Sequence, residues 1–183
     1  MEQDDKLTAK RISKLQRIVR YSVTVIASVL LIVVCIAVYN FYRLTPDRLF
    51  NEKYEAFELA AGSDSTETSI RRAYREKKYG EVIKLNANSV LSIKDIFLTG
   101  MAFLETNDLS KAISSYQVVL ADVKNDATLK NTAEYYLALA YLKNNDYDQS
   151  IELMNAIHDN SSHLYAKKFS RKYINRVKRL KWR

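Results

Sequence analysis

Few side chains in this 183-residue chain have the type and spacing that chemistry at a protein site requires. His158 and His163, the two histidines, stand five residues apart, whereas two metal ligands on one helix face are three or four residues apart. The single cysteine, Cys35, lies inside an apolar run. The sequence has no phosphate-binding glycine loop, nucleophile elbow or cysteine cluster. We therefore expect a protein that is not an enzyme, with no catalytic residues, no cofactor and no metal site.

The longest uncharged stretch lies between Arg20 and Arg43 and contains 22 residues. Valine, isoleucine, leucine and alanine dominate it, and tyrosines stand at its two ends, where amphipathic rings favour the headgroup layer. At about 1.5 Å per helical residue, this length spans a hydrocarbon core about 30 Å thick. A buried core helix would have a polar face, which this stretch lacks. We predict a transmembrane helix over residues 21–42.

More basic residues precede this predicted span than follow it. Residues 1–20 hold six lysines and arginines, and Arg43, Arg48 and Lys53 follow the span. This excess favours a cytoplasmic N-terminus, with the bulk of the chain on the far side of the membrane. A cleaved export signal is the alternative, but the run is longer than the usual signal core and lacks a small-x-small cleavage site. We expect a bitopic, single-pass protein of the inner (cell) membrane with a periplasmic domain.

One short pattern occurs three times in the remaining chain. It covers Tyr79 to Ile83, Leu109 to Ile113 and Tyr147 to Ile151, at spacings of 30 and 38 residues. These spacings average 34, the period of a helix-turn-helix repeat. Asn107-Asp108 and Asn145-Asp146 precede the second and third copies. Asparagine tolerates the left-handed conformation that ends a helix, and aspartate can cap the next helix.

On this pattern the chain resembles the tetratricopeptide repeat (TPR) family. Small and aromatic residues fall where that family packs its two antiparallel helices together. They are Gly100, Phe103, Ala112 and Tyr116 in the unit 93–126, and Ala138, Tyr141, Ser150 and Met154 in the unit 131–164. The resemblance implies about three TPR-like helical hairpins over residues 66–164. The first unit, 66–92, is degenerate, with Ala73 and Tyr74 one residue out of register.

The whole chain is predicted to be all-α. An N-terminal transmembrane helix is followed by a juxtamembrane helix and linker over residues 43–65, the helix running from Pro46 to Ala61. A short TPR-like α-superhelix over 66–164 comes next. Residues 165–183 then form a basic amphipathic helix that caps the last repeat. Its apolar stripe consists of Tyr165, Phe169, Tyr173, Val177 and Leu180.

The resemblance also implies a concave groove that binds a protein partner. Its predicted lining residues are Phe97, Met101, Leu104, Tyr135, Leu139 and Leu142. The lysines and asparagines with which related repeats clamp a terminal carboxylate are replaced here by apolar and aromatic residues, so the expected ligand is an apolar helix or an unfolded segment. The alternative is that these residues pack against neighbouring helices or against the segment from Leu49 to Leu59.

The C-terminal residues 165–183 contain nine basic and no acidic side chains. We refer to seven of them as the basic tail: Lys167, Lys168, Arg171, Lys172, Arg176, Lys178 and Arg179. They are expected to form a solvated cap of the repeat, to bind anionic lipid headgroups, or to bind an acidic protein. Nucleic acid is disfavoured, because the tail is predicted to lie outside the cytoplasm.

In layout the chain is similar to bacterial membrane-anchored TPR proteins with a small periplasmic superhelix. This implies a non-enzymatic scaffold that binds a protein partner at the periplasmic face of the inner membrane, in secretion or envelope protein assembly. One alternative is a transmembrane signalling or regulatory adaptor that works through its short cytoplasmic segment. Another is an organelle adaptor in a eukaryote, for which Asn160-Ser161-Ser162 would be a glycosylation acceptor.

Overall fold

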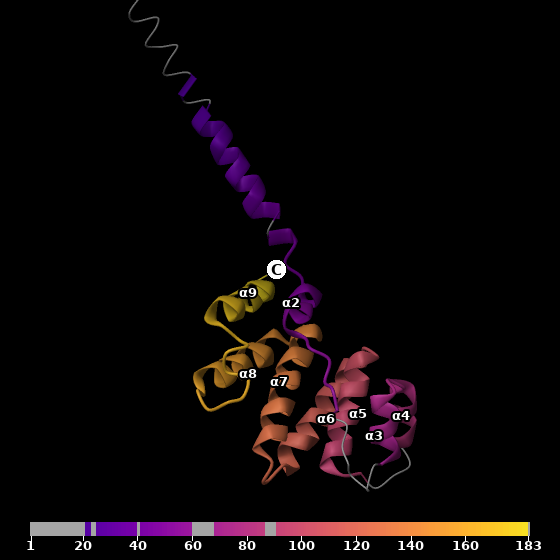
Figure 1. Ribbon diagram of the computed structural model, residues 1–183. Coiled ribbons are helices and arrows are strands. Elements are labelled where there is room, and N and C mark those ends of the chain that lie inside the picture. The colour runs from indigo at the N-terminus through magenta and orange to yellow at the C-terminus, as the bar shows by residue number, and fades with distance from the viewer. Residues whose placement is uncertain (1–20, 23–24, 40, 60–67, 87–90, 183) are drawn as a thin grey trace, which may run out of the picture. The chain divides into compact units, whose positions relative to one another are not determined.

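The computed structural model describes residues 21–22, 25–39, 41–59, 68–86 and 91–182. The chain divides into two compact units, Met1–Leu44 and Thr45–Arg183, each of which is described by itself. All regular secondary structure among the described residues is helical (Figure 1). This part of the chain therefore has the all-α fold that the sequence predicts.

The described part of the first unit is dominated by a helix over residues 25–39. Its large apolar side chains are exposed, from 48% at Val38 to 65% at Leu31. Across the described residues, no helix has both the length and the apolar character needed to cross a membrane. The predicted transmembrane helix over 21–42 is therefore not confirmed. Its residues 23, 24 and 40, and the predicted basic segment 1–20, lie outside the described residues.

The second unit begins with α2, Pro46–Lys53. The Thr45 hydroxyl caps this helix by accepting from the Arg48 N–H at 3.2 Å, and proline suits the first turn, where no N–H is needed. The prediction that this helix continues to residue 61 is wrong. Tyr54 is already extended (φ −67°, ψ 125°), and residues 54–59 have no regular structure.

Three helical hairpins follow, and each helix packs mainly against the next one along the chain (Figure 1). This arrangement confirms the predicted hairpins. The helices are α3 Ser69–Arg75, α4 Tyr79–Asn86, α5 Ile93–Glu105, α6 Leu109–Asp122, α7 Ala127–Lys143 and α8 Tyr147–Asp159. The predicted linker after residue 61, which ends at residue 65, lies outside the described residues.

The same turn joins the two helices of every hairpin. Lys77, Asn107 and Asn145 have positive φ angles of 56°, 62° and 66°. The residue after each one donates its N–H to a carbonyl five residues earlier, at 2.9, 2.8 and 2.9 Å. This is the hydrogen-bond pattern of a left-handed helix stop. The first hairpin therefore has the same turn as the other two, although its helices are shorter.

The sequence predicted that the aspartates after the two turn asparagines cap the next helix. This prediction is wrong. Neither Asp108 nor Asp146 makes a side-chain hydrogen bond to its helix N-terminus. Asp108 instead accepts from the Lys111 ammonium at 2.6 Å, and Asp146 accepts from the Asn144 amide at 2.6 Å. Each turn is thus held by its asparagine and main-chain bonds.

Small residues allow close packing where the two helices of a hairpin cross. Ala112 and Ser150 are fully buried at equivalent places, and the Ser150 hydroxyl donates to the Ala138 carbonyl at 2.9 Å. At Gly100, an added Cβ would lie 2.9 Å from the ring of the fully buried Tyr116. The predicted small and aromatic stations therefore form the contact between α5 and α6.

We expect Gly100→Ala to destabilise the domain by about 1–3 kcal/mol, because neither the backbone nor the buried ring can move away without strain. Gly80→Ala is the matched control, since an added Cβ there would meet nothing within 4 Å. That change should stabilise α4 by about 0.5–1 kcal/mol. Urea unfolding followed by circular dichroism would measure both, and equal effects would contradict the close crossing.

The last helix, α9, covers Arg171–Lys181 and is shorter than the predicted helix over 165–183. Residues 161–169 form a series of tight turns, in which the N–H groups of His163, Ala166 and Lys168 each donate to a carbonyl three residues earlier. The Ser170 hydroxyl then caps α9. Four members of the predicted apolar stripe are buried all the same: Phe169, Tyr173, Val177 and Leu180.

Candidate partner-binding groove

The six predicted groove residues lie on α5 and α7, and all of them are buried. None is more than 2% exposed: Phe97, Met101, Leu104, Tyr135, Leu139 and Leu142. These residues therefore do not line an open groove. Of the two alternatives that the sequence left, packing within the chain itself is the one that the structure shows.

Residues 45–59, which we call the groove segment, cover the predicted groove. Phe57 places its ring edge-on to Phe97, with 5.0 Å between the ring centres. Tyr54 stands edge-on to Tyr136 at 6.2 Å, and Phe50 stacks on Tyr54 at 4.7 Å. Aromatic side chains of the groove segment therefore occupy the place that a partner's apolar residues would take.

Tyrosine hydroxyls from the hairpins bind the main chain of the groove segment. Tyr135 donates to the Lys53 carbonyl at 2.5 Å, Tyr136 to the Glu55 carbonyl at 2.8 Å, and Tyr74 to the Phe57 carbonyl at 2.9 Å. The acceptors are alternate carbonyls, which suits an extended chain and not a helix. These bonds explain why α2 stops at Lys53.

A fourth tyrosine binds the start of the groove segment from the C-terminal end of the fold. The Tyr173 hydroxyl of α9 donates to the Leu49 carbonyl at 2.7 Å. The Lys53 ammonium lies 5.2 Å from the centre of the Tyr173 ring, and the Lys143 ammonium lies 4.7 Å from that of Phe50. Cation–π attraction therefore adds to the hydrogen bonds that hold this end of the segment.

The groove tyrosines are kept neutral by their surroundings. Burial raises the pKa of Tyr74, Tyr135, Tyr136 and Tyr173 well above the ordinary tyrosine value. Burial also raises the pKa of Tyr54, whose hydroxyl donates to the Glu105 carboxylate. A phenol must keep its proton to donate a hydrogen bond. The raised pKa values are therefore consistent with these hydroxyls acting as donors.

Ion pairs divide the basic tail into two groups. Arg176 binds Glu52 through two hydrogen bonds of 2.6 and 2.9 Å, Lys168 pairs with Glu55 at 2.5 Å, and Arg171 pairs with Asp159. The remaining four are exposed and have no acidic partner in the described part of the chain: Lys167, Lys172, Lys178 and Arg179. The tail is thus partly an intramolecular clamp on the groove segment.

The buried histidine, His163, has a packing role. His163 is 6% exposed, and its Nδ1 accepts from the Tyr165 N–H at 3.0 Å. Its Nε2 therefore carries the proton and donates to Glu134 at 3.0 Å. Among the described residues, no group of histidine, cysteine and acidic side chains is arranged to hold a metal ion.

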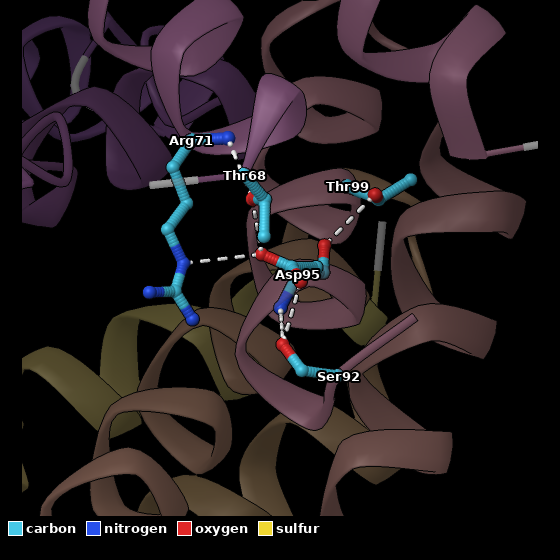
Figure 2. A network of polar contacts seen from close by, with 5 residues as sticks. All are labelled: Thr68, Arg71, Ser92, Asp95 and Thr99. Carbon is cyan, nitrogen blue, oxygen red and sulfur yellow. Dashed lines mark hydrogen bonds and ion pairs between the residues drawn. The ribbon is translucent and has the colours of Figure 1, made fainter. Parts of the chain in front are cut away.

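The most connected polar cluster joins the first hairpin to the second (Figure 2). Asp95 is 3% exposed, and its carboxylate accepts from the hydroxyls of Thr68 at 3.0 Å and Ser92 at 2.6 Å. Arg71 adds an ion pair at 3.2 Å. Because Thr68 and Ser92 also cap α3 and α5, one buried carboxylate ties two helix starts together.

We expect Asp95→Asn to lower the free energy of unfolding by about 2 kcal/mol, since the amide has one acceptor oxygen for three donors and no charge for Arg71. The exposed Asp122→Asn is the control and should change stability by less than about 0.5 kcal/mol. Thermal unfolding of both variants would measure this. A shift no larger than that of the control would mean that the cluster is not formed.

A surface pocket of about 410 Å³ lies beside this cluster, between the starts of α5 and α7 and the α6–α7 connection. Its lining carries both signs of charge, and Lys94 pairs with Asp126 across part of it at 3.7 Å. This balance of charge favours no class of ligand.

Sequence reasoning named Tyr135 but missed Tyr136 and Tyr74, which bind the groove segment as directly. It also did not identify the segment's main chain as the bound group. The sequence signal for these residues was the number of tyrosines. The chain has 13, several of them on the predicted hairpins, and buried tyrosine hydroxyls need hydrogen-bond partners.

Comparison with known proteins supports the repeat. Residues 132–161 match the model of the tetratricopeptide repeat family. This stretch covers most of the α7–α8 hairpin, in which α7 supplies Tyr135 and Tyr136. No curated protein and no solved structure matches the chain. The chain thus contains a TPR repeat within a helical domain, which indicates a protein–protein interaction scaffold.

Proposed function

We propose that this chain is a non-enzymatic TPR scaffold whose groove binds an extended segment of a protein partner. The observation that supports this function is the groove segment itself, because the TPR-like helices hold it as they would hold a ligand. Three tyrosine hydroxyls bind its main chain, and such contacts do not depend on the ligand's side chains. Selectivity would come from aromatic residues spaced like Tyr54 and Phe57.

The same proposal places the scaffold on a membrane, anchored through residues 21–42. The uncharged run of 22 residues supports this, as does the helix over 25–39, whose valine, isoleucine and leucine side chains are all about half exposed or more. The basic excess in residues 1–20 supports a cytoplasmic N-terminus and a periplasmic repeat domain. Secretion or envelope protein assembly fits a receptor for extended segments at that surface.

Exchange of the groove segment for a free peptide tests the binding function. The probe is a fluorescent peptide of residues 50–59, FNEKYEAFEL, added to the full chain in detergent micelles. Phe57→Ala in the chain weakens the built-in competitor, whose effective concentration is on the order of millimolar. We expect fluorescence anisotropy to show at least about tenfold tighter binding to Phe57→Ala than to the unchanged chain.

Two controls make this result specific. A peptide with alanine in place of Tyr54 and Phe57 should not bind, and circular dichroism should show that the Phe57→Ala chain is folded. Equal binding of the two peptides, or no binding of the natural one to a folded Phe57→Ala chain, would refute a groove that receives partner segments.

Anchoring and orientation need a separate measurement. Cys35→Ser removes the only cysteine, and Val118→Cys then places one thiol at an exposed position of α6. We expect the protein to stay in the membrane pellet after carbonate extraction. A membrane-impermeant maleimide should label residue 118 in spheroplasts but not in inverted vesicles. Release by carbonate would refute the anchor, and the reverse labelling would refute the orientation.

A further inference from the structure

The outward face of α9 is basic and ends in a tryptophan. At about 100° per residue, the buried Tyr173, Ile174, Val177 and Leu180 share one side of the helix. The other side exposes Lys172, Lys178, Arg179 and Trp182. Trp182 is 84% exposed, which makes it the most exposed large apolar side chain among the described residues.

Three of the six basic side chains of α9 are unpaired, in contrast to the other three. Arg171, Arg176 and Lys181 are paired with Asp159, Glu52 and Asp148. Lys172, Lys178 and Arg179 have no acidic partner in the part of the chain that the structure describes. Intramolecular pairing therefore does not explain this cluster. Helix α9 itself contains no acidic residue.

Chain connectivity limits how far this face can be from a membrane. Helix α9 lies against α2, because Tyr173 binds the Leu49 carbonyl at 2.7 Å and Arg176 binds Glu52. Helix α2 begins at Pro46, four residues after the end of the proposed span. Four residues extend at most about 14 Å. The first residue of α2, the helix against which α9 packs, therefore lies within about 14 Å of the end of the proposed span.

We propose that Lys172, Lys178, Arg179 and Trp182 bind anionic lipid headgroups of the membrane in which the chain is anchored. This inference rests on the proposed anchor. Basic side chains are attracted to an anionic surface, where each contributes about fivefold in affinity, and an indole ring favours the headgroup layer. An acidic protein would satisfy the charges but would not by itself account for the tryptophan at the end of the same face.

Trp182 is the only tryptophan of the chain, so its fluorescence reports on this face alone. The full chain would be reconstituted in nanodiscs of phosphatidylcholine, with and without phosphatidylglycerol. In anionic discs we expect a blue-shifted emission, protection from acrylamide and quenching by brominated lipid. Discs without anionic lipid, or high salt, should reverse all three effects.

The test variant is Lys172→Gln/Lys178→Gln/Arg179→Gln, which should lose the blue shift through a roughly 100-fold weaker association of α9 with the surface. The control variant, Lys77→Gln/Lys124→Gln/Lys130→Gln, removes the same charge from exposed positions on other elements. It should keep the blue shift.

The outcomes separate this inference from the anchor. Failure of the chain to enter nanodiscs would refute the anchor. Entry with Trp182 still open to acrylamide in anionic discs would overturn the lipid contact while leaving the anchor intact. A blue shift produced by added polyglutamate but not by anionic lipid would also overturn it, and would identify an acidic protein as the partner of α9.

Discussion

Raising the pH above about 10 should unfold the repeat domain cooperatively. Burial raises the pKa of Tyr74, Tyr135, Tyr136 and Tyr173 in the folded chain. The unfolded chain ionises near pH 10, so the stabilisation is complete below that pH and is lost as the pH rises toward the folded-state values. Each group contributes about 1.4 kcal/mol per pH unit, or roughly 5–6 kcal/mol for the four, which is comparable with the whole stability of a domain.

Absorbance at 295 nm and circular dichroism at 222 nm would follow tyrosinate and helix together. We expect the ionisation of the buried tyrosines and the loss of helix to occur in one transition. Tyr136→Phe should raise the alkaline midpoint, because phenylalanine cannot ionise, although it costs about 1 kcal/mol at neutral pH by leaving the Glu55 carbonyl without its donor. Full tyrosine ionisation near pH 10 with the helix intact would contradict the buried hydrogen-bonded hydroxyls.

Truncating the two aromatic anchors of the groove segment should strongly destabilise the domain. Tyr54→Ala/Phe57→Ala removes the rings that contact Tyr136 and Phe97. Both residues are half-buried, so we expect a loss of about 4–6 kcal/mol, somewhat below that of two fully buried rings. Part of this loss is the exposure of the groove to water.

Urea unfolding of the full chain in detergent would measure this loss, with Glu58→Ala as the matched control. Glu58 belongs to the same segment and is exposed, so its truncation should cost less than about 0.5 kcal/mol. If the double variant proved as stable as Glu58→Ala, the segment could not be filling the groove.

The features that sequence predicted well are local. The repeat spacing, the turn asparagines Asn107 and Asn145, and the small residues at Gly100 and Ala138 each depend on neighbours within one hairpin. A left-handed residue after a helix needs only its own backbone preference. A helix crossing needs only a small residue opposite a large one. Local rules therefore sufficed for the number of hairpins and their turns.

The errors came from contacts that helical periodicity does not include. The helix predicted from Pro46 to Ala61 stops at Lys53 because hydroxyls more than 80 residues away bind the carbonyls of Lys53 and Glu55. The C-terminal helix begins at Arg171 because local turns hold residues 161–169. Amphipathic periodicity reveals neither the distant hydroxyls nor the local turns, because it counts only residues on one helix face.

For the candidate site, the sequence left open whether a partner or the chain itself covers the groove. Phe97 and Tyr135 line a groove in both interpretations, since an apolar surface has the same sequence pattern whether a partner or the chain itself covers it. The basic tail shows the same limit. Its pairing with Glu52 and Glu55 depends on acids more than 100 residues away, which spacing along the tail could not identify.

Photo-crosslinking from position 57 tests most directly whether the groove is occupied by the chain's own segment. p-Benzoylphenylalanine would replace Phe57 in the full-length protein, and irradiated membranes would be analysed by peptide mass spectrometry. We predict crosslinks within the same chain to the peptides that contain Phe97, Tyr136 and Tyr74, whose rings lie 5.0, 6.4 and 6.5 Å from Phe57. Crosslinks only to other proteins, or none within the folded chain, would contradict a groove occupied by residues 45–59.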